Sequence, residues 1–203
     1  MRTFFLIMLA MSGLSTFSQT KAKEVFAAAP DSIFPLLTTN NRLDCIDLIE
    51  NNMKATVKNK LEQKAEMTAL TDSYLQIKPS ERSVVEIKML NDSVFCLINT
   101  CLGPAPDSRI SFFTRDWKPY AMTFPTPHAS DFWKSVPDSL AREANFAQRS
   151  LEDLLLIQIS ADKENTELTL TIQTSELSGK EKEIAQKYVQ PLRYRWNGKG
   201  FTR

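Results

Sequence analysis

The sequence contains little histidine, glycine or cysteine. Its 203 residues include one histidine, five glycines and three cysteines. A structural zinc site usually needs four Cys or His ligands at short spacings. A phosphate-binding loop needs several glycines, so that the backbone can approach the phosphates. We therefore expect no cofactor and no resident metal, and the sequence nominates no catalytic residue.

An excess of positive charge is also absent. The chain has 25 Lys and Arg residues against 24 Asp and Glu residues. Proteins that bind nucleic acids normally carry clustered Lys and Arg that displace counterions from phosphates. We therefore expect no nucleic-acid partner.

The longest apolar run, from Phe4 to Met11, is too short to span a bilayer, which takes about 20 residues. One positive charge, Arg2, precedes it and small polar residues follow it, which is the layout of a secretory signal peptide. We expect residues 1–18 to be removed, leaving Gln19 first, although an uncleaved anchor is the alternative. Export to the periplasm or beyond follows, with no transmembrane segment in the mature chain.

Export would place the three cysteines in an oxidising compartment, where disulfides can form. Cys96 and Cys101 lie five positions apart in one predicted strand, so they point to opposite faces and cannot bridge each other. Cys45 could pair with one of them. Burial as free thiols is the commoner arrangement, and the disulfide status stays open.

The first half predicts one helix and a set of strands. After an extended N-terminus, apolar residues at three- and four-residue spacing predict an amphipathic helix over 42–58, capped by Asn40 and Asn41. A short strand at 74–77 comes first; strands at 84–90 and 94–102 then flank a tight turn. Because residues 94–98 are apolar on both faces, that strand should lie inside a sheet, between the helix and a further layer.

The second half continues in the same way. A strand at 110–114 is followed by a hairpin of 154–160 and 167–173, a helical connector around 180–187, and a strand at 192–196 before the turn Asn197-Gly198. The fold class is therefore α+β, with antiparallel β-meanders and short helices packed on the sheet. We expect a single domain over 19–203, and two similar halves, 24–125 and 126–203, are an open alternative.

The tripeptide Pro-Asp-Ser occurs at 30–32, 106–108 and 137–139. Proline fixes φ, and Asp or Ser then bonds nearby amides in turns and helix caps. We interpret the three copies as punctuation of the chain. The alternative, three acidic loops around a cation, needs oxygen ligands that converge in space.

Aromatic residues and prolines concentrate between Phe112 and Trp133, which holds seven of the 19 aromatic residues. Loops displayed on a rigid scaffold often carry binding, and aromatic side chains with a polar edge are favoured at interfaces. The segment 117–133 is therefore the candidate binding surface. Its candidate residues are Trp117, Tyr120, Phe124, His128, Phe132 and Trp133. The alternative is that these rings close one end of the core.

Three stretches together resemble a family of exported Bacteroidales proteins that carries a "domain of unknown function" label. They are Pro30 to Leu37, Asn41 to Ile49, and Pro106 to Phe113 with the following Asp116-Trp117. The resemblance covers nearly all of the mature chain. It implies a Gram-negative envelope location and supplies no mechanism.

These observations favour an exported, non-enzymatic binding or protein-interaction domain with a protein or glycan partner. Two alternatives stay open. One is an envelope hydrolase that uses paired carboxylates about 5 to 10 Å apart. The other is a structural component of an envelope assembly.

Overall fold

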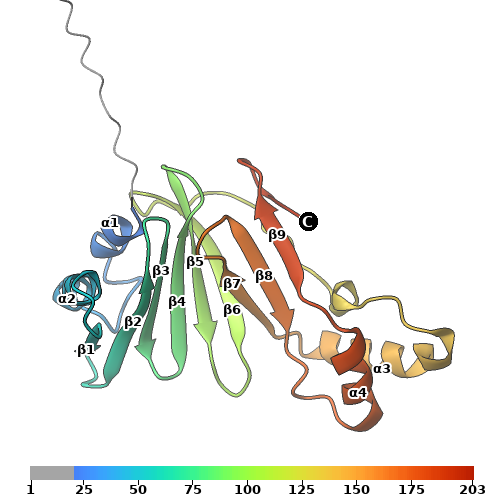
Figure 1. Ribbon diagram of the computed structural model, residues 1–203. Coiled ribbons are helices and arrows are strands. Elements are labelled where there is room, and N and C mark those ends of the chain that lie inside the picture. Colours follow the sequence, from blue (N-terminus) through green and yellow to red (C-terminus); the bar gives the residue numbers. More distant parts are fainter. Residues whose placement is uncertain (1–20) are drawn as a thin grey trace, which may run out of the picture.

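The computed structural model describes residues 21–203, which form two antiparallel sheets with helices packed against them (Figure 1). The predicted signal peptide lies outside the described residues. The first sheet has the strand order β1-β2-β3-β4-β5-β6. Its strands are β1 (Thr56–Lys58), β2 (Lys64–Leu70), β3 (Tyr74–Ser80), β4 (Ser83–Met89), β5 (Val94–Cys101) and β6 (Asp107–Thr114).

The second sheet has the order β10-β9-β8-β7, so that each strand pairs with its neighbour in the sequence. Its strands are β7 (Ile157–Ala161), β8 (Glu167–Ile172), β9 (Leu192–Trp196) and β10 (Phe201–Thr202). The predicted α+β class with antiparallel meanders is therefore confirmed. The two sheets differ in size and in their connectors, because β8 and β9 are joined through a helix whereas β5 and β6 are joined through a loop. The suggestion of two similar halves stays a prediction.

Strand β5 lies inside the first sheet with both faces buried, as its sequence predicts. Phe95 and Leu97 pack in the hydrophobic cluster that faces the N-terminal helices, and Cys96 and Ile98 pack in the cluster shared with the second sheet. The side chain of Asn91 fixes the preceding hairpin by accepting the N–H groups of residues 93 and 94. The first sheet therefore carries one core on each face.

Two helices, α1 (Ala22–Ala27) and α2 (Thr39–Glu50), cover the outer face of the first sheet (Figure 1). The extended N-terminus expected from the sequence is wrong, because residues 22–27 are helical and bury Val25 and Phe26 against the sheet. Helix α1 has six residues, and its apolar residues are too few to show a helical period, so this short helix could not be predicted from the sequence.

Helix α2 also differs from the predicted range of 42–58. Thr38 is the N-cap, since its hydroxyl accepts the N–H of Asn41 while the Asn41 amide accepts the N–H of Thr38. The helix ends at Glu50, and Asn52 adopts a positive φ of 57°. The chain reverses there, and residues 56–58 form the edge strand β1 instead of a last helical turn.

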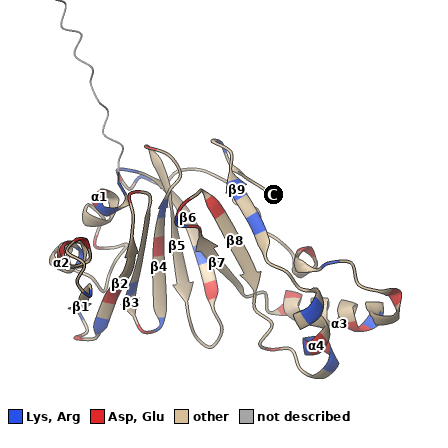
Figure 2. Ribbon diagram, in the orientation of Figure 1, with Lys and Arg blue, Asp and Glu red and all other residues tan. Residues whose placement is uncertain are grey.

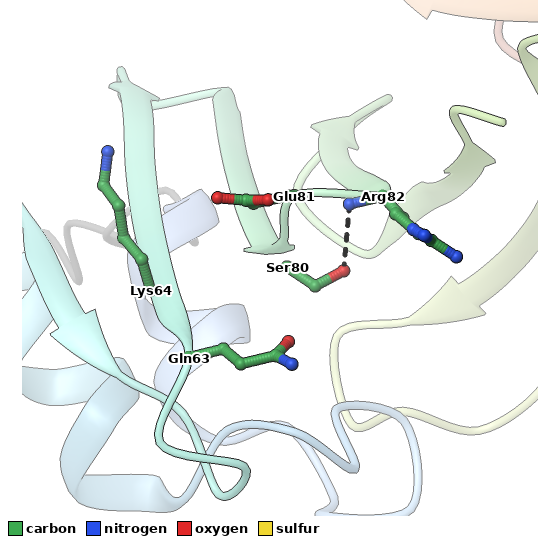
Figure 3. Close-up of a pocket in the computed structure, with 5 residues that line it drawn as sticks. All are labelled: Gln63, Lys64, Ser80, Glu81 and Arg82. Carbon is green, nitrogen blue, oxygen red and sulfur yellow. Dashed lines mark hydrogen bonds between the residues drawn. The ribbon is translucent and has the colours of Figure 1, made fainter.

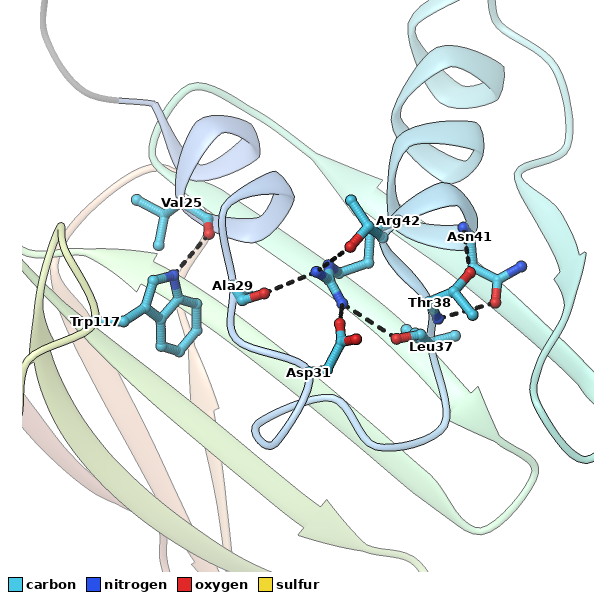
Figure 4. A network of polar contacts seen from close by, with 9 residues as sticks. Val25, Ala29, Asp31, Leu37, Thr38, Asn41, Arg42 and Trp117 are labelled. Carbon is cyan, nitrogen blue, oxygen red and sulfur yellow. Dashed lines mark hydrogen bonds and ion pairs between the residues drawn. The ribbon is translucent and has the colours of Figure 1, made fainter.

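Arg42 of α2 is buried, and its guanidinium group holds the turn that joins α1 to α2 (Figure 4). One terminal nitrogen donates to the carboxylate of Asp31 and the carbonyl of Leu37, both at 3.1 Å. The other donates to the carbonyl of Ala29 at 2.7 Å and the hydroxyl of Thr39 at 3.2 Å. The first Pro-Asp-Ser copy thus lies in a turn that a buried arginine fixes.

Strand β7 packs on the first sheet through side chains, not through a shared ladder. The N–H groups of residues 157, 159 and 161 donate to Asp107, Ser108 and Glu86, at 3.1, 2.9 and 2.8 Å. The second Pro-Asp-Ser copy therefore lies at the start of β6, and its Asp and Ser side chains also accept hydrogen bonds from the edge strand β7. Asp138 of the third copy starts a 3₁₀ turn, η2 (Asp138–Leu140), so the three copies serve different elements.

The helices α3 (Ala141–Asp153) and α4 (Gly179–Tyr188) lie together at one end of the second sheet (Figure 1). Ala147 and Leu151 of α3 and Ala185 of α4 join the core between the sheets. None of the helices within residues 21–203 is long and apolar enough to cross a membrane.

The three cysteines are free thiols. Cys45 and Cys96 are buried, whereas Cys101 is exposed. The prediction that Cys96 and Cys101 do not bridge each other is confirmed, and Cys45 forms no disulfide with either.

Candidate functional site

Trp117, which the sequence placed on the candidate binding surface, lies inside the chain's own core. Its indole N–H donates to the carbonyl of Val25 at 2.9 Å (Figure 4). Its ring packs against Phe34, Phe95 and Phe113, with centroid distances of 6.1, 4.8 and 5.3 Å. This ring therefore fastens the start of the 117–133 segment to α1 and leaves little area for a partner.

Three further residues of the segment contribute to the core beside the second sheet. Phe132 is fully buried, and Phe124 is half-buried against Tyr194 and Phe201, with centroids 5.7 and 5.4 Å away. Trp133 is half-buried, and its indole N–H is enclosed without a hydrogen-bond partner among the described residues. These rings follow the core-closing alternative, since Phe132 belongs to the hydrophobic cluster beside the second sheet and Phe124 and Trp133 pack against it.

Tyr120 and His128 are the exposed members of the predicted set. Tyr120 is 38% exposed and lies beside the end of β6, where its N–H donates to the carbonyl of Phe112. His128 lies next to α3, and 76% of its side chain is exposed. The six predicted residues therefore lie at different places, and the His128 end adjoins a pocket lined by residues of another element.

His128 is held against α3 by Glu152. The Nδ1 atom of His128 lies 2.9 Å from one carboxylate oxygen of Glu152, and the other oxygen accepts the N–H of Ala129 at 2.6 Å. The N–H of His128 donates to Asp131 at 2.8 Å, which caps the short 3₁₀ turn η1 (Ala129–Phe132). Both oxygens of Glu152 are thus occupied by the loop.

The pair perturbs the protonation of both residues. The hydrogen bond that His128 makes to Glu152 raises the pKa of His128 above its usual 6.5, and the nearby carboxylate of Asp131 adds to the effect. The N–H of Ala129 and then His128 lower the pKa of Glu152. The charged pair therefore forms below about pH 6.5 for as long as Glu152 stays ionised, and it is lost as the pH rises through the pKa of His128 in the folded chain.

A pocket of about 440 Å³ opens between this loop and α3. Most of its wall comes from one face of α3, since Asn145, Gln148, Arg149 and Glu152 recur at three- and four-residue spacing. The opposite face of the helix carries the buried residues Ala144, Ala147 and Leu151. The residues that line the pocket are His128, Ser130, Asn145, Gln148, Arg149 and Glu152.

Another pocket, of about 520 Å³, lies between the hairpin ends of β2, β3 and β4 (Figure 3). It is lined by Gln63, Lys64, Ser80, Glu81 and Arg82. Figure 3 shows the charged ends of Lys64 and Arg82 pointing away from each other, and Lys64 forms an ion pair with Glu66. These side chains do not converge on a common point, so this pocket is the weaker candidate.

Among residues 21–203, Glu86 is the acidic residue whose side chain is buried. Burial raises its pKa, although the N–H of Ala161 and the amide of Gln76 partly offset the effect. It is 5% exposed and lies between the two sheets, outside the pockets described above. Nearby, burial lowers the pKa of Lys88, whose ammonium group donates to the hydroxyl of Ser73 and the carbonyl of Lys163. This polar cluster joins the sheets.

Charges of both signs are interspersed over the two sheets and the helices (Figure 2). Arg149 nevertheless makes no ion pair within residues 21–203, whereas Glu152 beside it is already occupied. The pocket beside α3 therefore presents an unpaired guanidinium group among neutral hydrogen-bonding groups.

Sequence reasoning found His128 in this pocket but missed the residues of α3. The sequence does contain a signal for them, because polar residues recur with a helical period opposite Ala144, Ala147 and Leu151. The contact between residue 128 and residue 152 carries no such signal, since it depends on how the loop folds back on α3.

Comparisons with known proteins are consistent with this fold. A family model described as "Protein of unknown function (DUF3256)" matches residues 14–201. A solved structure, a domain of an uncharacterized protein from Porphyromonas gingivalis W83, is similar over 89% of this chain and 96% of that chain, with 26% identity and a TM-score of 0.71. That organism belongs to the Bacteroidales, so the resemblance drawn from the sequence is confirmed. No curated protein matches.

Proposed function

This chain belongs to the DUF3256 family, and from that premise we propose that it is an exported, non-enzymatic binding domain of the cell envelope. Its contact site is the pocket between residues 128–130 and α3. The observation that carries the proposal is the convergence there of polar side chains from two separate segments of the chain, next to an unpaired arginine.

The chemistry of the pocket suits recognition of a polar ligand. Ser130, Asn145 and Gln148 supply neutral hydrogen-bond donors and acceptors, and Arg149 supplies a fixed fork of donors. Small-ligand pockets usually have volumes of about 300 to 1,000 Å³, and this one differs from most of them in that its lining residues are all polar. The pocket volume of about 440 Å³ would hold one or two sugar rings or a few side chains of a protein partner.

The hydrolase alternative is less well supported by the same residues. A carboxylic acid that serves as a general acid needs a raised pKa and access to a cleft. Glu86 has the raised pKa but is enclosed between the sheets, and Glu152 lines the pocket but has a lowered pKa. Glu66 and Glu81 line another pocket together, but the hydrogen bond from Lys64 lowers the pKa of Glu66. The carboxyl group with a raised pKa and the carboxyl groups that line these pockets are therefore different residues.

Export is tested by expressing the full chain in a Gram-negative host and sequencing the N-terminus of the protein released from the periplasm. We expect a mature chain that begins at Gln19. A cytoplasmic protein that retains Met1 would contradict export without bearing on the pocket.

Binding is tested by incubating the labelled protein with an array of glycans and peptides. We expect a defined subset of spots to be bound, and we expect the double variant Asn145→Ala/Gln148→Ala to lose them. Arg109→Gln, an exposed change on β6, is the matched control and should bind as the unmodified chain does. Equal binding by the double variant would place the contact elsewhere and contradict the assigned site. If the protein runs as a monomer when purified from the envelope, the assembly-component alternative loses support.

A further inference from the structure

The residues around His128 and Arg149 suit a ligand with a negative charge, and this inference rests on the proposed function. Arg149 lines the pocket without an ion-pair partner among residues 21–203. An arginine fork binds a carboxylate through two parallel N–H···O bonds, which a neutral group cannot match. The pocket therefore favours carboxylate-bearing ligands over neutral ones.

The single acid in the pocket does not cancel this preference. The two oxygens of Glu152 accept from His128 and from the N–H of Ala129, so both are engaged by the loop, and protonation of His128 offsets the negative charge that Glu152 retains. Asp131 is engaged similarly, since it accepts the N–H of His128 at 2.8 Å. Both acids thus serve to hold the loop, and the guanidinium group of Arg149 is available to a ligand.

His128 adds a second cation that depends on pH. Its Nδ1 atom faces Glu152, so its Nε2 atom lies on the exposed side of the ring. In the neutral ring that donates through Nδ1, Nε2 can only accept a hydrogen bond. Protonation turns Nε2 into a donor and adds a positive charge to the pocket. The charged groups that bear on the ring are Glu152 and Arg149 from α3 and Asp131 from η1.

The other groups at the pocket point to a sugar. Ser130, Asn145 and Gln148 match hydroxyl groups, which both donate and accept. Peptides are commonly bound at a free sheet edge, in an apolar or aromatic groove, or by a cluster of arginines, whereas the residues that line this pocket are polar and include one arginine. We propose that the pocket binds an acidic sugar of a polysaccharide, through Arg149 and protonated His128.

Matched pairs of ligands test this proposal. The probes are disaccharides that end in glucuronate or galacturonate, together with the methyl esters of the same sugars, which remove the charge and keep the hydroxyl groups. Binding of the full mature chain is measured by calorimetry at pH 5.5 and pH 8. Such acids stay ionised throughout this range, so the change with pH reports on the protein.

We expect an acid to bind at least about ten-fold more tightly than its ester, since a hydrogen bond to a charged group contributes about 1.5 kcal/mol or more. Affinity for the acid should rise by up to about five-fold from pH 8 to pH 5.5, because an ion pair with the exposed His128 is screened by water. Arg149→Gln should remove the preference for the acid, and Arg109→Gln should keep it. His128→Gln should make the affinity independent of pH, because the glutamine amide can still donate a hydrogen bond to Glu152 but does not titrate.

The other possible results contradict either the acidic-sugar inference alone or the proposed function as well. Equal binding of acid and ester shows a sugar site without charge selection, which contradicts the acidic-sugar inference and leaves the binding function standing. The same holds if only other array members bind and Asn145→Ala/Gln148→Ala abolishes that binding. If no glycan or peptide binds at either pH, the inference and the proposed function both fail.

Discussion

Replacement of the buried Arg42 by Met should destabilise the chain strongly. Methionine has a similar length and keeps the space filled, so the change removes the charge and the hydrogen bonds with little loss of volume. The carbonyl groups of Ala29 and Leu37 then lose their donor. A buried acceptor left without a partner costs about 1 to 3 kcal/mol.

The two carbonyls together set the expected magnitude. The hydroxyl of Thr39 and the carboxylate of Asp31 lie closer to water, and the side chain of Asp31 is 60% exposed, so their loss adds little. We expect the free energy of unfolding to fall by about 3 kcal/mol. For a chain of this size, that corresponds to a decrease in Tm of about 6 to 12 °C.

Urea denaturation of the mature chain, followed by tryptophan fluorescence, measures this change. Asp31→Asn is the matched control, because it removes the charge of the exposed partner and leaves both carbonyl bonds in place. It should cost less than about 1 kcal/mol. The reasoning is refuted if Arg42→Met costs no more than Asp31→Asn.

Two further predictions concern single titratable groups. His128 is the sole histidine, so its ring resonances in NMR are unambiguous. They should titrate above the usual 6.5, and Glu152→Gln should bring the pKa back toward that value, whereas an unchanged titration would show that the pair does not form. A thiol reagent should modify Cys101 in the folded chain. Burial raises the pKa of Cys45 to about 11 and that of Cys96 to about 12, so these two should react only after unfolding. Fast labelling of a natively folded Cys101→Ser variant would show that Cys45 or Cys96 is accessible and would contradict their burial.

The sequence predicted the strands with the clearest patterns. Strand β5 and its hairpin turn could be predicted because residues 94–98 are apolar on both faces and Asn91-Asp92-Ser93 is a strong turn signal. Strand β9 was predicted at its observed bounds, since Arg193 and Arg195 alternate with buried residues.

Other elements could not be predicted from the sequence pattern. Strand β2 buries only the small Ala65 and the flexible Met67, so its alternation is faint. Helix α2 turns its largest polar residue, Arg42, inward and leaves Leu43 44% exposed, which reverses the usual pattern. Only part of the candidate site could be predicted from the sequence. Local composition indicated the loop that carries His128, whereas the contact of His128 with Glu152 depends on the tertiary structure.

The central claim is that a ligand binds in the pocket between His128 and α3. Chemical-shift mapping tests this directly, with the ¹⁵N-labelled mature chain titrated with glucuronate at pH 5.5. We expect saturable shifts at residues 128–130 and 145–152, together with the His128 ring, and we expect Arg149→Gln to need clearly more glucuronate to reach the same shifts. Shifts centred on the hairpin ends around Ser80, or an unchanged spectrum at saturating sugar, would contradict it.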